Sequence, residues 1–318
     1  MTAFTELPNV AAERLGGRVL LANDEFFAPK ENLLKASKPV WREDEYTDRG
    51  KWMDGWETRR RRTPGHDWCI VRLGIPSIVR GIVVDTAFFR GNYPEHCSLE
   101  ACAVAEDATP EAMATSDCGW TEILPRSALR GDAENPFAVA YSDRVTHLRF
   151  NIYPDGGVAR LRVFGEPLAS AGAPGAVIDL AAVTNGGLVL ACSDMFFGNR
   201  HNLILPGRST HMGDGWETKR RRGPGHDWIV VRLAGRGTIR RIEVDTDHFK
   251  GNAPESCAVD TRDGDDAEWT ELLPRTGLQP HSQHGFDVKS SGAATHARLA
   301  IYPDGGIARL RLFGTLAK

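Results

Sequence analysis

A glutamate followed by a run of basic residues occurs twice in the chain, as ETRRRR at residues 57–62 and as ETKRRR at residues 217–222. A guanidinium group binds a carboxylate through a rigid two-pronged fork, so such a run suits a site for a small anionic molecule. In an extended run the side chains alternate between two faces, with Glu57, Arg59 and Arg61 on one and Thr58, Arg60 and Arg62 on the other. We expect one face to make structural ion pairs and the other to clamp a carboxylate.

Two further residue types could transfer protons. His66 stands at the entry to an apolar run, and an imidazole has a pKa near working pH, so it is a candidate general base. The alternative is that His66 and Asp67 only cap the preceding turn. Asp85 and Asp245 each end an apolar run, where partial burial would tune the pKa of a proton-transferring carboxyl. The alternative for both aspartates is a turn in which the carboxylate accepts a backbone N–H and closes the strand.

The candidate site residues occur in matching pairs. The candidate catalytic residues are Asp85, Glu57 and His66, with Asp245, Glu217 and His226 in the second copy. The candidate substrate-binding residues are Arg60, Arg61, Arg149 and Asn92, with Arg220, Arg221, Arg298 and Asn252 in the second copy. If Asp85 and Asp245 transfer protons, replacing them with Asn should lower kcat by about 10²-fold or more.

No metal site is predicted. His281 and His284 have the spacing of a ligand pair but lie in a polar stretch, and the matching part of the first copy, around residues 131–135, has no histidine. The chain has neither an HExxH motif nor a cysteine-rich finger. We therefore expect no cofactor, although the sequence leaves a divalent metal open.

The chain is a duplication. Residues 54–73 and 214–233 are identical at sixteen of twenty positions, and IYPDGGVARLRVFG from Ile152 matches the segment from Ile301 at twelve of fourteen. The offset between the copies falls from 170 to 160 and then to 149 residues, so the first copy carries insertions. A period this long indicates two domains, which we place at residues 1–166 and 176–318 with a linker at residues 167–175.

Within each copy the apolar residues alternate with polar ones, as in strands. We expect strands at residues 68–73 and 78–86, and a β-hairpin in which residues 148–152 and 158–164 flank a Pro-Asp-Gly-Gly turn. Short helices begin at the expected N-caps Asn9 and Asp179 and stop at Gly16 and Gly186. Many short strands with little helix predict an all-β chain with one β-sandwich, or jelly roll, in each copy.

Composition narrows the function classes. The chain has 318 residues, with 39 Lys+Arg against 42 Asp+Glu and a net charge of −3, which argues against a nucleic-acid or membrane-surface protein. No apolar run reaches the roughly 20 residues of a membrane span, and the N-terminal residues lack the pattern of a secretion signal. The six cysteines form no CxxC motif, so we expect reduced thiols and a cytoplasmic location.

The repeated motifs resemble those of the allantoicase (allantoate amidinohydrolase) family through both copies. They are GWETRRRR with the following GHDW, DTAFFRGN, WTEILPR and IYPDGGVARLRVFG. The resemblance implies two tandem galactose-binding-like jelly rolls, a homo-oligomer, and hydrolysis of allantoate to ureidoglycolate and urea in purine (allantoin) degradation. In the second copy His248 replaces Phe88 and Ala300 replaces Asn151, so we favour the first copy as the site.

The competing interpretation is a tandem jelly roll that binds carbohydrate or another ligand without catalysis. Such a module needs exposed aromatic platforms or a calcium cage at its loop tips. Here the tryptophans lie inside the repeated charged blocks, which favours the enzyme.

Overall fold

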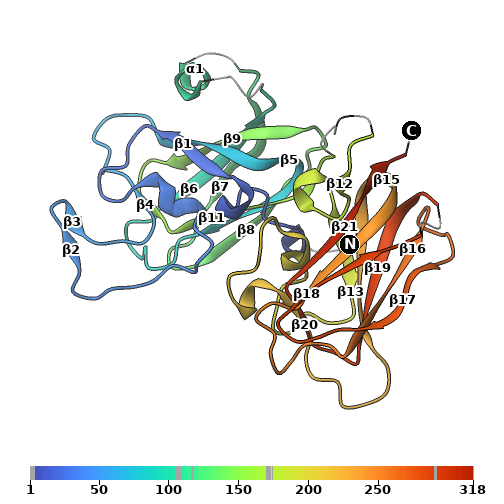
Figure 1. Ribbon diagram of the computed structural model, residues 1–318. Helices are drawn as coiled ribbons and strands as arrows, with labels where there is room; N and C mark the ends of the chain where they lie inside the picture. The colour runs from blue at the N-terminus through green and yellow to red at the C-terminus, as the bar shows by residue number, and fades with distance from the viewer. Residues whose placement is uncertain are drawn as a thin grey trace. The chain divides into compact units, whose positions relative to one another are not determined.

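The structure is a computed structural model that describes residues 4–104, 109–115, 118–169, 173, 175–289 and 292–317. The chain divides into two compact units, Met1–Glu166 and Pro167–Lys318, drawn from blue to green and from yellow to red in Figure 1. The boundary falls at the start of the linker predicted at residues 167–175, of which residues 170–172 and 174 lie outside the described residues.

The first unit is built from strands with a few short helical turns. Its strands are β1 (Arg18–Ala22), β2 (Tyr46–Thr47), β3 (Gly50–Lys51), β4 (Trp56–Glu57), β5 (Asp67–Asp85), β6 (His96–Cys102), β7 (Thr121–Ala128), β8 (Glu134–Ala138), β9 (Val145–Tyr153), β10 (Gly157–Val158) and β11 (Arg160–Pro167). Its helical segments are η1 (Phe4–Glu6), η2 (Glu13–Leu15), η3 (Lys30–Leu34) and α1 (Pro110–Thr115).

Among its described residues the second unit repeats this order without counterparts of η1, β2, β3 and α1. Its strands are β12 (Ile178–Asp179), β13 (Leu188–Cys192), β14 (Trp216–Glu217), β15 (Asp227–Asp245), β16 (Ser256–Arg262), β17 (Thr270–Gly277), β18 (Gln283–Asp287), β19 (Ala294–Tyr302), β20 (Gly306–Ile307) and β21 (Arg309–Leu316). Its helical turns are η4 (Val183–Asn185), η5 (Arg200–Ile204) and η6 (Met212–Asp214). Of these elements, β12 and η6 are additions with no counterpart among the described residues of the first unit.

One long strand organises each unit. The first half of β5 pairs with β1 and β9, and its second half pairs with β8 and β11. The register breaks between Arg72 and Ser77, where the strand passes from one set of partners to the other. Strand β15 does the same, with its break between Arg232 and Gly237. The predicted all-β fold of two tandem β-sandwiches is confirmed.

The core lies between the two sets of strands. Phe150 and Ile152 of β9, Cys69 and Val71 of β5 and Leu99 of β6 are fully buried and belong to one apolar cluster. Because successive strand residues point to opposite faces, the residues between them lie on the outer face of the sheet. Cys97 and Cys257 are also fully buried, as expected for core residues. The six cysteines all lie among the described residues, and none of them forms a disulfide.

Three local predictions were wrong. The strands that flank the Pro-Asp-Gly-Gly turn do not form a hairpin, because β9 pairs with β5 and β6 whereas β11 pairs with β5 alone. The strands predicted at residues 68–73 and 78–86 are not separate, because β5 runs without a break from Asp67 to Asp85. Asn9 and Asp179 do not cap helices. The side-chain oxygen of Asn9 accepts the backbone N–H groups of Ala11 and Val163. The carboxylate of Asp179 accepts those of Ala181 and Leu312.

The helix stops were placed correctly, because Gly16 and Gly186 close η2 and η4 in the left-handed conformation. Among the described residues, no helix is long and apolar enough to cross a membrane.

Candidate functional site

Glu57 is fixed by the short ladder of β4. Strand β4 pairs with β10, with Glu57 opposite Gly157. The backbone of Glu57 also exchanges hydrogen bonds with Ala28. The neighbouring Trp56 is fully buried, and its indole N–H donates to the carbonyl of Asp24 at 2.8 Å. The backbone of Glu57 is therefore held on both sides, and only its side chain is left to face the loops.

The residues that follow Glu57 form a loop, residues 58–62, which we call the arginine loop. Its backbone is tied to the Pro-Asp-Gly-Gly turn: the amide of Arg61 donates to the Asp155 carboxylate at 2.8 Å. The hydroxyl of Thr58 accepts the amide of Gly156 at 3.1 Å. The repeated turn thus positions the repeated arginine loop, which explains why both motifs occur together in each copy.

The glycines of this turn allow a close approach of segment 92–94. Gly156 has a φ of +137°, and a Cβ there would lie 2.7 Å from the carbonyl oxygen of Asn92. A Cβ at Gly157 would lie 1.9 Å from the ring of Phe89. Only glycine fits both positions, and the amide of Gly157 donates to the Asn92 carbonyl at 2.8 Å. This contact brings Asn92 beside Glu57.

Only the arginines of the loop alternate in their ion pairs, because the loop is not a strand and Glu57 is not kept apart from Arg60 and Arg62. Arg59 pairs with Asp24 at 2.6 Å, and Arg61 pairs with the buried Asp67 at 2.5 Å. Arg60 and Arg62 are exposed and make no hydrogen bond or ion pair within the part of the chain that the structure describes. One set of arginines is therefore structural, and the other is available to bind an anion.

Glu57, Arg60, Arg62, Asn92, Tyr93 and Asp155 line one hollow of about 910 Å³, the arginine-loop hollow. The Glu57 carboxylate accepts the side-chain amide of Asn92 at 2.7 Å. Burial raises the pKa of Glu57, and the hydrogen bond from Asn92 offsets this only in part. A carboxyl group of raised pKa beside two unpaired guanidinium groups can hold a proton near an anionic ligand.

The second unit keeps this framework. Glu217 accepts the side-chain amide of Asn252 at 2.6 Å, and the amide of Arg221 donates to Asp304 at 2.8 Å. The side chain of Arg221 pairs with the buried Asp227. Arg220 and Arg222 are exposed, as are their counterparts in the first unit. The hydrogen bond from an asparagine amide to the glutamate carboxylate is thus a feature of both repeats.

The walls around the two sites differ. In the first unit an inserted segment places Trp41 and Lys51 in a second hollow of about 310 Å³, which also includes Glu57 and Asn92. Figure 1 shows the β2–β3 hairpin of this insertion projecting from the unit. The second unit has Ala253 in place of Tyr93 and lacks the insertion. Phe196 and Phe197 are consequently 71% and 61% exposed.

Two predicted residues of the first unit lie in a different hollow. His66 and Arg149 line a hollow of about 540 Å³ on the outer face of the sheet, the sheet-face hollow, together with Arg61. The His66 ring lies 4.7 Å from the ring of Tyr153. Asp67 does not orient His66, because its carboxylate binds Arg61 and Asn23 instead. The structure therefore joins Glu57, Arg60 and Asn92 in one hollow and His66 and Arg149 in another, with Arg61 in both.

Their counterparts in the second unit keep some of these contacts. His226 lies 4.7 Å from Tyr302, as His66 lies against Tyr153. Arg298 donates to Asp260 through two nitrogens, at 3.1 and 2.7 Å.

Asp85 and Asp245 line neither hollow. Each closes its long strand by accepting the backbone amide two residues on, at 2.8 Å in both cases. Burial raises the pKa of Asp85, and the facing Glu134 carboxylate adds to this rise. The proton-transfer role predicted for these aspartates stays a prediction.

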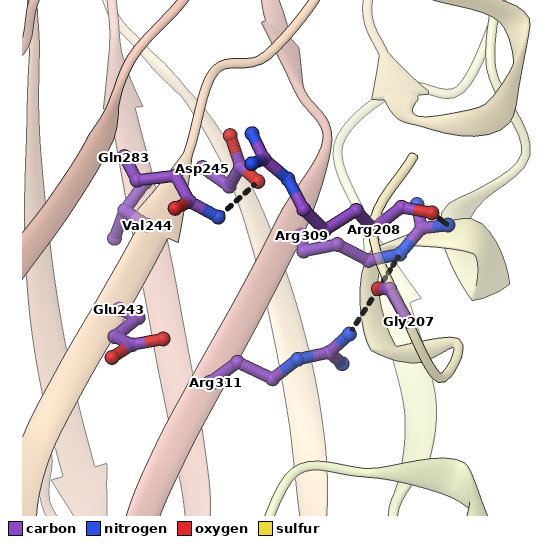
Figure 2. A pocket seen from close by; sticks show the side chains of 8 residues that line it. All are labelled: Gly207, Arg208, Glu243, Val244, Asp245, Gln283, Arg309 and Arg311. Atoms are coloured by element: carbon purple, nitrogen blue, oxygen red, sulfur yellow. Dashed lines mark hydrogen bonds between the residues drawn. The ribbon is translucent and has the colours of Figure 1, made fainter. Parts of the chain in front are cut away.

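Asp245 lines a separate hollow of about 230 Å³ in the second unit. Figure 2 shows Gln283 bound to its carboxylate, at 3.1 Å, and shows Arg309 and Arg311 both directed at the carbonyl of Gly207.

Sequence reasoning missed some residues of the arginine-loop hollow. Arg62 and Asp155 were not among the candidates, although the alternation places Arg62 on the same face as Arg60, and Asp155 is repeated as Asp304. Among the described residues no group of three or more His, Cys, Asp or Glu side chains is arranged to hold a metal ion. His284 makes hydrogen bonds through both ring nitrogens to its own unit.

Comparison with known proteins gives a consistent result over the whole chain. A family model described as the allantoicase repeat matches residues 8–168 and 178–317. A probable allantoicase of Streptomyces avermitilis is 49% identical, covering 99% of this chain and 87% of the relative. The allantoicase of Dictyostelium discoideum is 48% identical, covering 97% of this chain and 87% of the relative.

The fold agrees with a solved structure as well. The crystal structure of allantoicase from Saccharomyces cerevisiae superimposes with a TM-score of 0.81 at 36% sequence identity, covering 97% of this chain and 93% of that one. The family model matches both repeats, and the relatives match nearly the full length. The chain belongs to the allantoicase family.

Proposed function

We propose that the arginine-loop hollow of the first repeat is the site at which this protein hydrolyses allantoate to ureidoglycolate and urea in purine degradation. The reaction follows from family membership. The observation that carries the location is Glu57, a half-buried carboxyl group of raised pKa that is hydrogen-bonded to Asn92. It lies in one hollow with Arg60 and Arg62, which have no partner among the described residues.

The chemistry of the substrate fits these groups. Allantoate has one carboxylate and one carbon that bears two ureido groups. Arg60 and Arg62 offer guanidinium forks for the carboxylate. Asn92 and the backbone of the loop hold Glu57 in place, so a bound substrate would meet a fixed proton donor rather than a flexible one.

Glu57 then serves both halves of the reaction. Its carboxyl group gives a proton to one ureido nitrogen as the bond from that nitrogen to the central carbon breaks and urea leaves. The lone pair of the remaining ureido nitrogen stabilises the electron-poor carbon. Water adds to this carbon and returns a proton to the Glu57 carboxylate, which gives ureidoglycolate and restores the acid.

The first repeat is favoured over the second because its hollow has more complete walls. Tyr93 and the inserted segment with Trp41 and Lys51 surround Glu57 in the first repeat. In the second repeat Ala253 replaces Tyr93, and the adjoining Phe196 and Phe197 are largely exposed. A site that excludes water strengthens the interactions between its charged groups and the substrate.

A matched pair of variants tests this proposal. Glu57→Gln keeps the hydrogen bond from Asn92 but has no proton to give, so we expect kcat for urea release to fall by about 10²-fold or more. Glu217→Gln makes the same change in the second repeat and should leave kcat within about threefold of the original. A large loss in Glu217→Gln with none in Glu57→Gln would reject the assignment.

The non-enzymatic carbohydrate-binding module is not favoured. Relatives named as allantoicases match this chain at 47–50% identity over nearly its whole length. An assay of urea release from allantoate separates the two functions directly.

Three further expectations are carried forward as proposals. We infer that turnover needs no resident cofactor, since Glu57 and the arginines supply the acid and the positive charge. A cytoplasmic location is supported by the six cysteines, which form no disulfide in the described part of the chain. Assembly with copies of the same chain is supported by the exposed Phe196 and Phe197, and light scattering of the purified protein measures it.

A further inference from the structure

The sheet-face hollow of the first repeat is a second polar site, apart from Glu57. Asn151 lies between Arg149 and Tyr153 on the outer face of β9, and its neighbour on β6 is Ser98. Asn151 and Ser98 are each only 3% exposed. Polar side chains this deeply buried are normally fully hydrogen-bonded, so their partners define what the hollow still lacks.

The hydrogen bonds fix the orientation of the Asn151 amide. Its Nδ2 donates to the hydroxyl of Ser98 at 3.0 Å and to the carboxylate of Glu100 at 3.1 Å. Ser98 in turn lies 3.0 Å from the hydroxyl of Tyr153. A carboxylate accepts and does not donate, so the NH₂ group must face Glu100. The Oδ1 of Asn151 is left as a buried acceptor without a partner in the described part of the chain.

A donor in the same hollow is also unsatisfied. The Nε of Arg149 is buried and has no hydrogen-bond partner among the described residues. Its Nη2 donates to the carbonyl of Met113 at 3.0 Å, and the guanidinium lies 3.9 Å from Glu100. The guanidinium also lies over the ring of Trp68, 5.6 Å from its centre. The Nε of Arg61, which also lines this hollow, is a second buried donor without a partner in the described part of the chain. The hollow therefore has one acceptor and two donors unsatisfied beside aromatic walls.

The charges that line the hollow balance. Arg61 and Arg149 are matched by Glu100 and Glu122, and Arg61 is already paired with Asp67. This balance disfavours a carboxylate ligand and suits a neutral one. A ureido group has N–H donors for the Asn151 oxygen and for the carboxylates, and a carbonyl oxygen for the Arg149 Nε.

We propose that the sheet-face hollow of the first repeat binds a neutral ureido compound, such as urea or a monosubstituted urea, separately from the arginine-loop hollow. The proposal does not depend on Glu57. Its consequence is that the product urea has a place on the protein outside the site of its formation.

The second repeat shows what the same surface is like without this site. Ala258 and Ala300 face each other at the register of Ser98 and Asn151. Asp260 replaces Glu100 and binds Arg298 through two nitrogens, at 3.1 and 2.7 Å. The charge of Arg298 is thus neutralised by Asp260, and the second repeat has no counterpart of the Asn151 amide.

The test uses methylurea as the probe and the full chain labelled with ¹⁵N. The indole N–H signal of Trp68, assigned with Trp68→Phe, should move in a saturable way at millimolar methylurea. The double variant Ser98→Ala/Asn151→Ala gives this surface the residues that the second repeat already has, so the fold should tolerate it. We expect the double variant to lose the saturable shift. Acetate at the same concentrations should not shift the wild-type signal.

Turnover separates this site from the catalytic one. The double variant should keep kcat/KM for allantoate within about threefold, because the arginine-loop hollow is unchanged. The proposal is overturned if wild-type protein shows no saturable shift, if the double variant retains it, or if kcat/KM falls further than threefold, since the hollow would then hold part of the substrate. Failure of Glu57→Gln to lower kcat would reject only the catalytic assignment.

Discussion

Glu57 of the first repeat and Glu217 of the second occupy the same position in their units, each bound to an asparagine amide and followed in the chain by two exposed arginines. The residues around them differ: Tyr93 and an inserted segment border Glu57, whereas Ala253 and exposed phenylalanines border Glu217. Both repeats have thus kept the backbone framework of the site, but only the first repeat encloses it with additional side chains. The residues that are repeated thus identify the shared framework, and the residues that differ identify the repeat in which we expect catalysis.

The shared framework should be equally sensitive in both repeats. Arg160 and Asp54 form a buried pair at 2.7 Å, and Arg309 and Asp214 form its counterpart at 2.9 Å. Removing one partner leaves a buried charge, so Arg160→Met and Arg309→Met should each lower the free energy of unfolding by about 3–5 kcal/mol. Guanidinium chloride unfolding measures this loss. A loss in only one repeat would show that the frameworks are not equivalent.

The unpaired arginines should matter in one repeat only. Replacing Arg60 and Arg62 together with Gln removes both guanidinium groups from the arginine-loop hollow, and kcat/KM should fall by about 10²-fold, mostly through KM. The same double change at Arg220 and Arg222 is the control and should have little effect. Steady-state assays of urea release give both values, and equal losses would mean that both repeats bind allantoate.

The pH dependence should follow Glu57. Burial raises its pKa, and the protonated form is the one that donates. As pH rises through this raised pKa, kcat/KM should fall by about tenfold per pH unit. Glu57→Gln should lack this alkaline limb in its residual activity. A pH profile that is the same in the variant and the wild type would assign the limb to another group.

Asp85 provides the sharpest contrast with Glu57, because both carboxyl groups have a raised pKa but only Glu57 lines the arginine-loop hollow. Asn at position 85 can still accept the amide of Ala87 and close the strand. We therefore expect Asp85→Asn to change kcat by less than about threefold. A loss of 10²-fold would restore Asp85 as the proton-transfer group predicted from its place at the end of an apolar strand.

Removal of metal ions should have the smallest effect. The proposed chemistry uses a carboxyl group and guanidinium groups only, so dialysis against EDTA should leave kcat within about twofold. Restoration of a lost activity by one divalent metal would show that the site needs that ion.

Much of the fold was readable from the duplication. The alternation of apolar residues predicted the strands, and the repeated Gly16 and Gly186 predicted where short helical turns stop. The pairing of β9 and β11 was not predictable from the turn between them, because β5 competes for both strands along its 19 residues. The Pro-Asp-Gly-Gly sequence predicts a turn between β9 and β11, but pairing with β5, which is distant in the sequence, determines the partners of both strands.

The candidate site was predicted in part for the same reason. Repetition selected Glu57, Arg60 and Asn92, which the structure brings together in one hollow. It could not select Ser98, whose counterpart is Ala258, because a residue that differs between the copies leaves no repeated signal. Arg149 lies on the outer face of β9, whereas Glu57 lies in the short strand β4 beside the arginine loop. A sequence pattern does not contain the distance between two such strands.

The location of the substrate is the most direct test of the account. Crystals of the Glu57→Gln variant soaked with allantoate should show the molecule in the arginine-loop hollow of the first repeat, with its carboxylate on Arg60 and Arg62 and a ureido nitrogen at position 57. Allantoate bound instead beside Glu217, or in neither arginine-loop hollow, would contradict it.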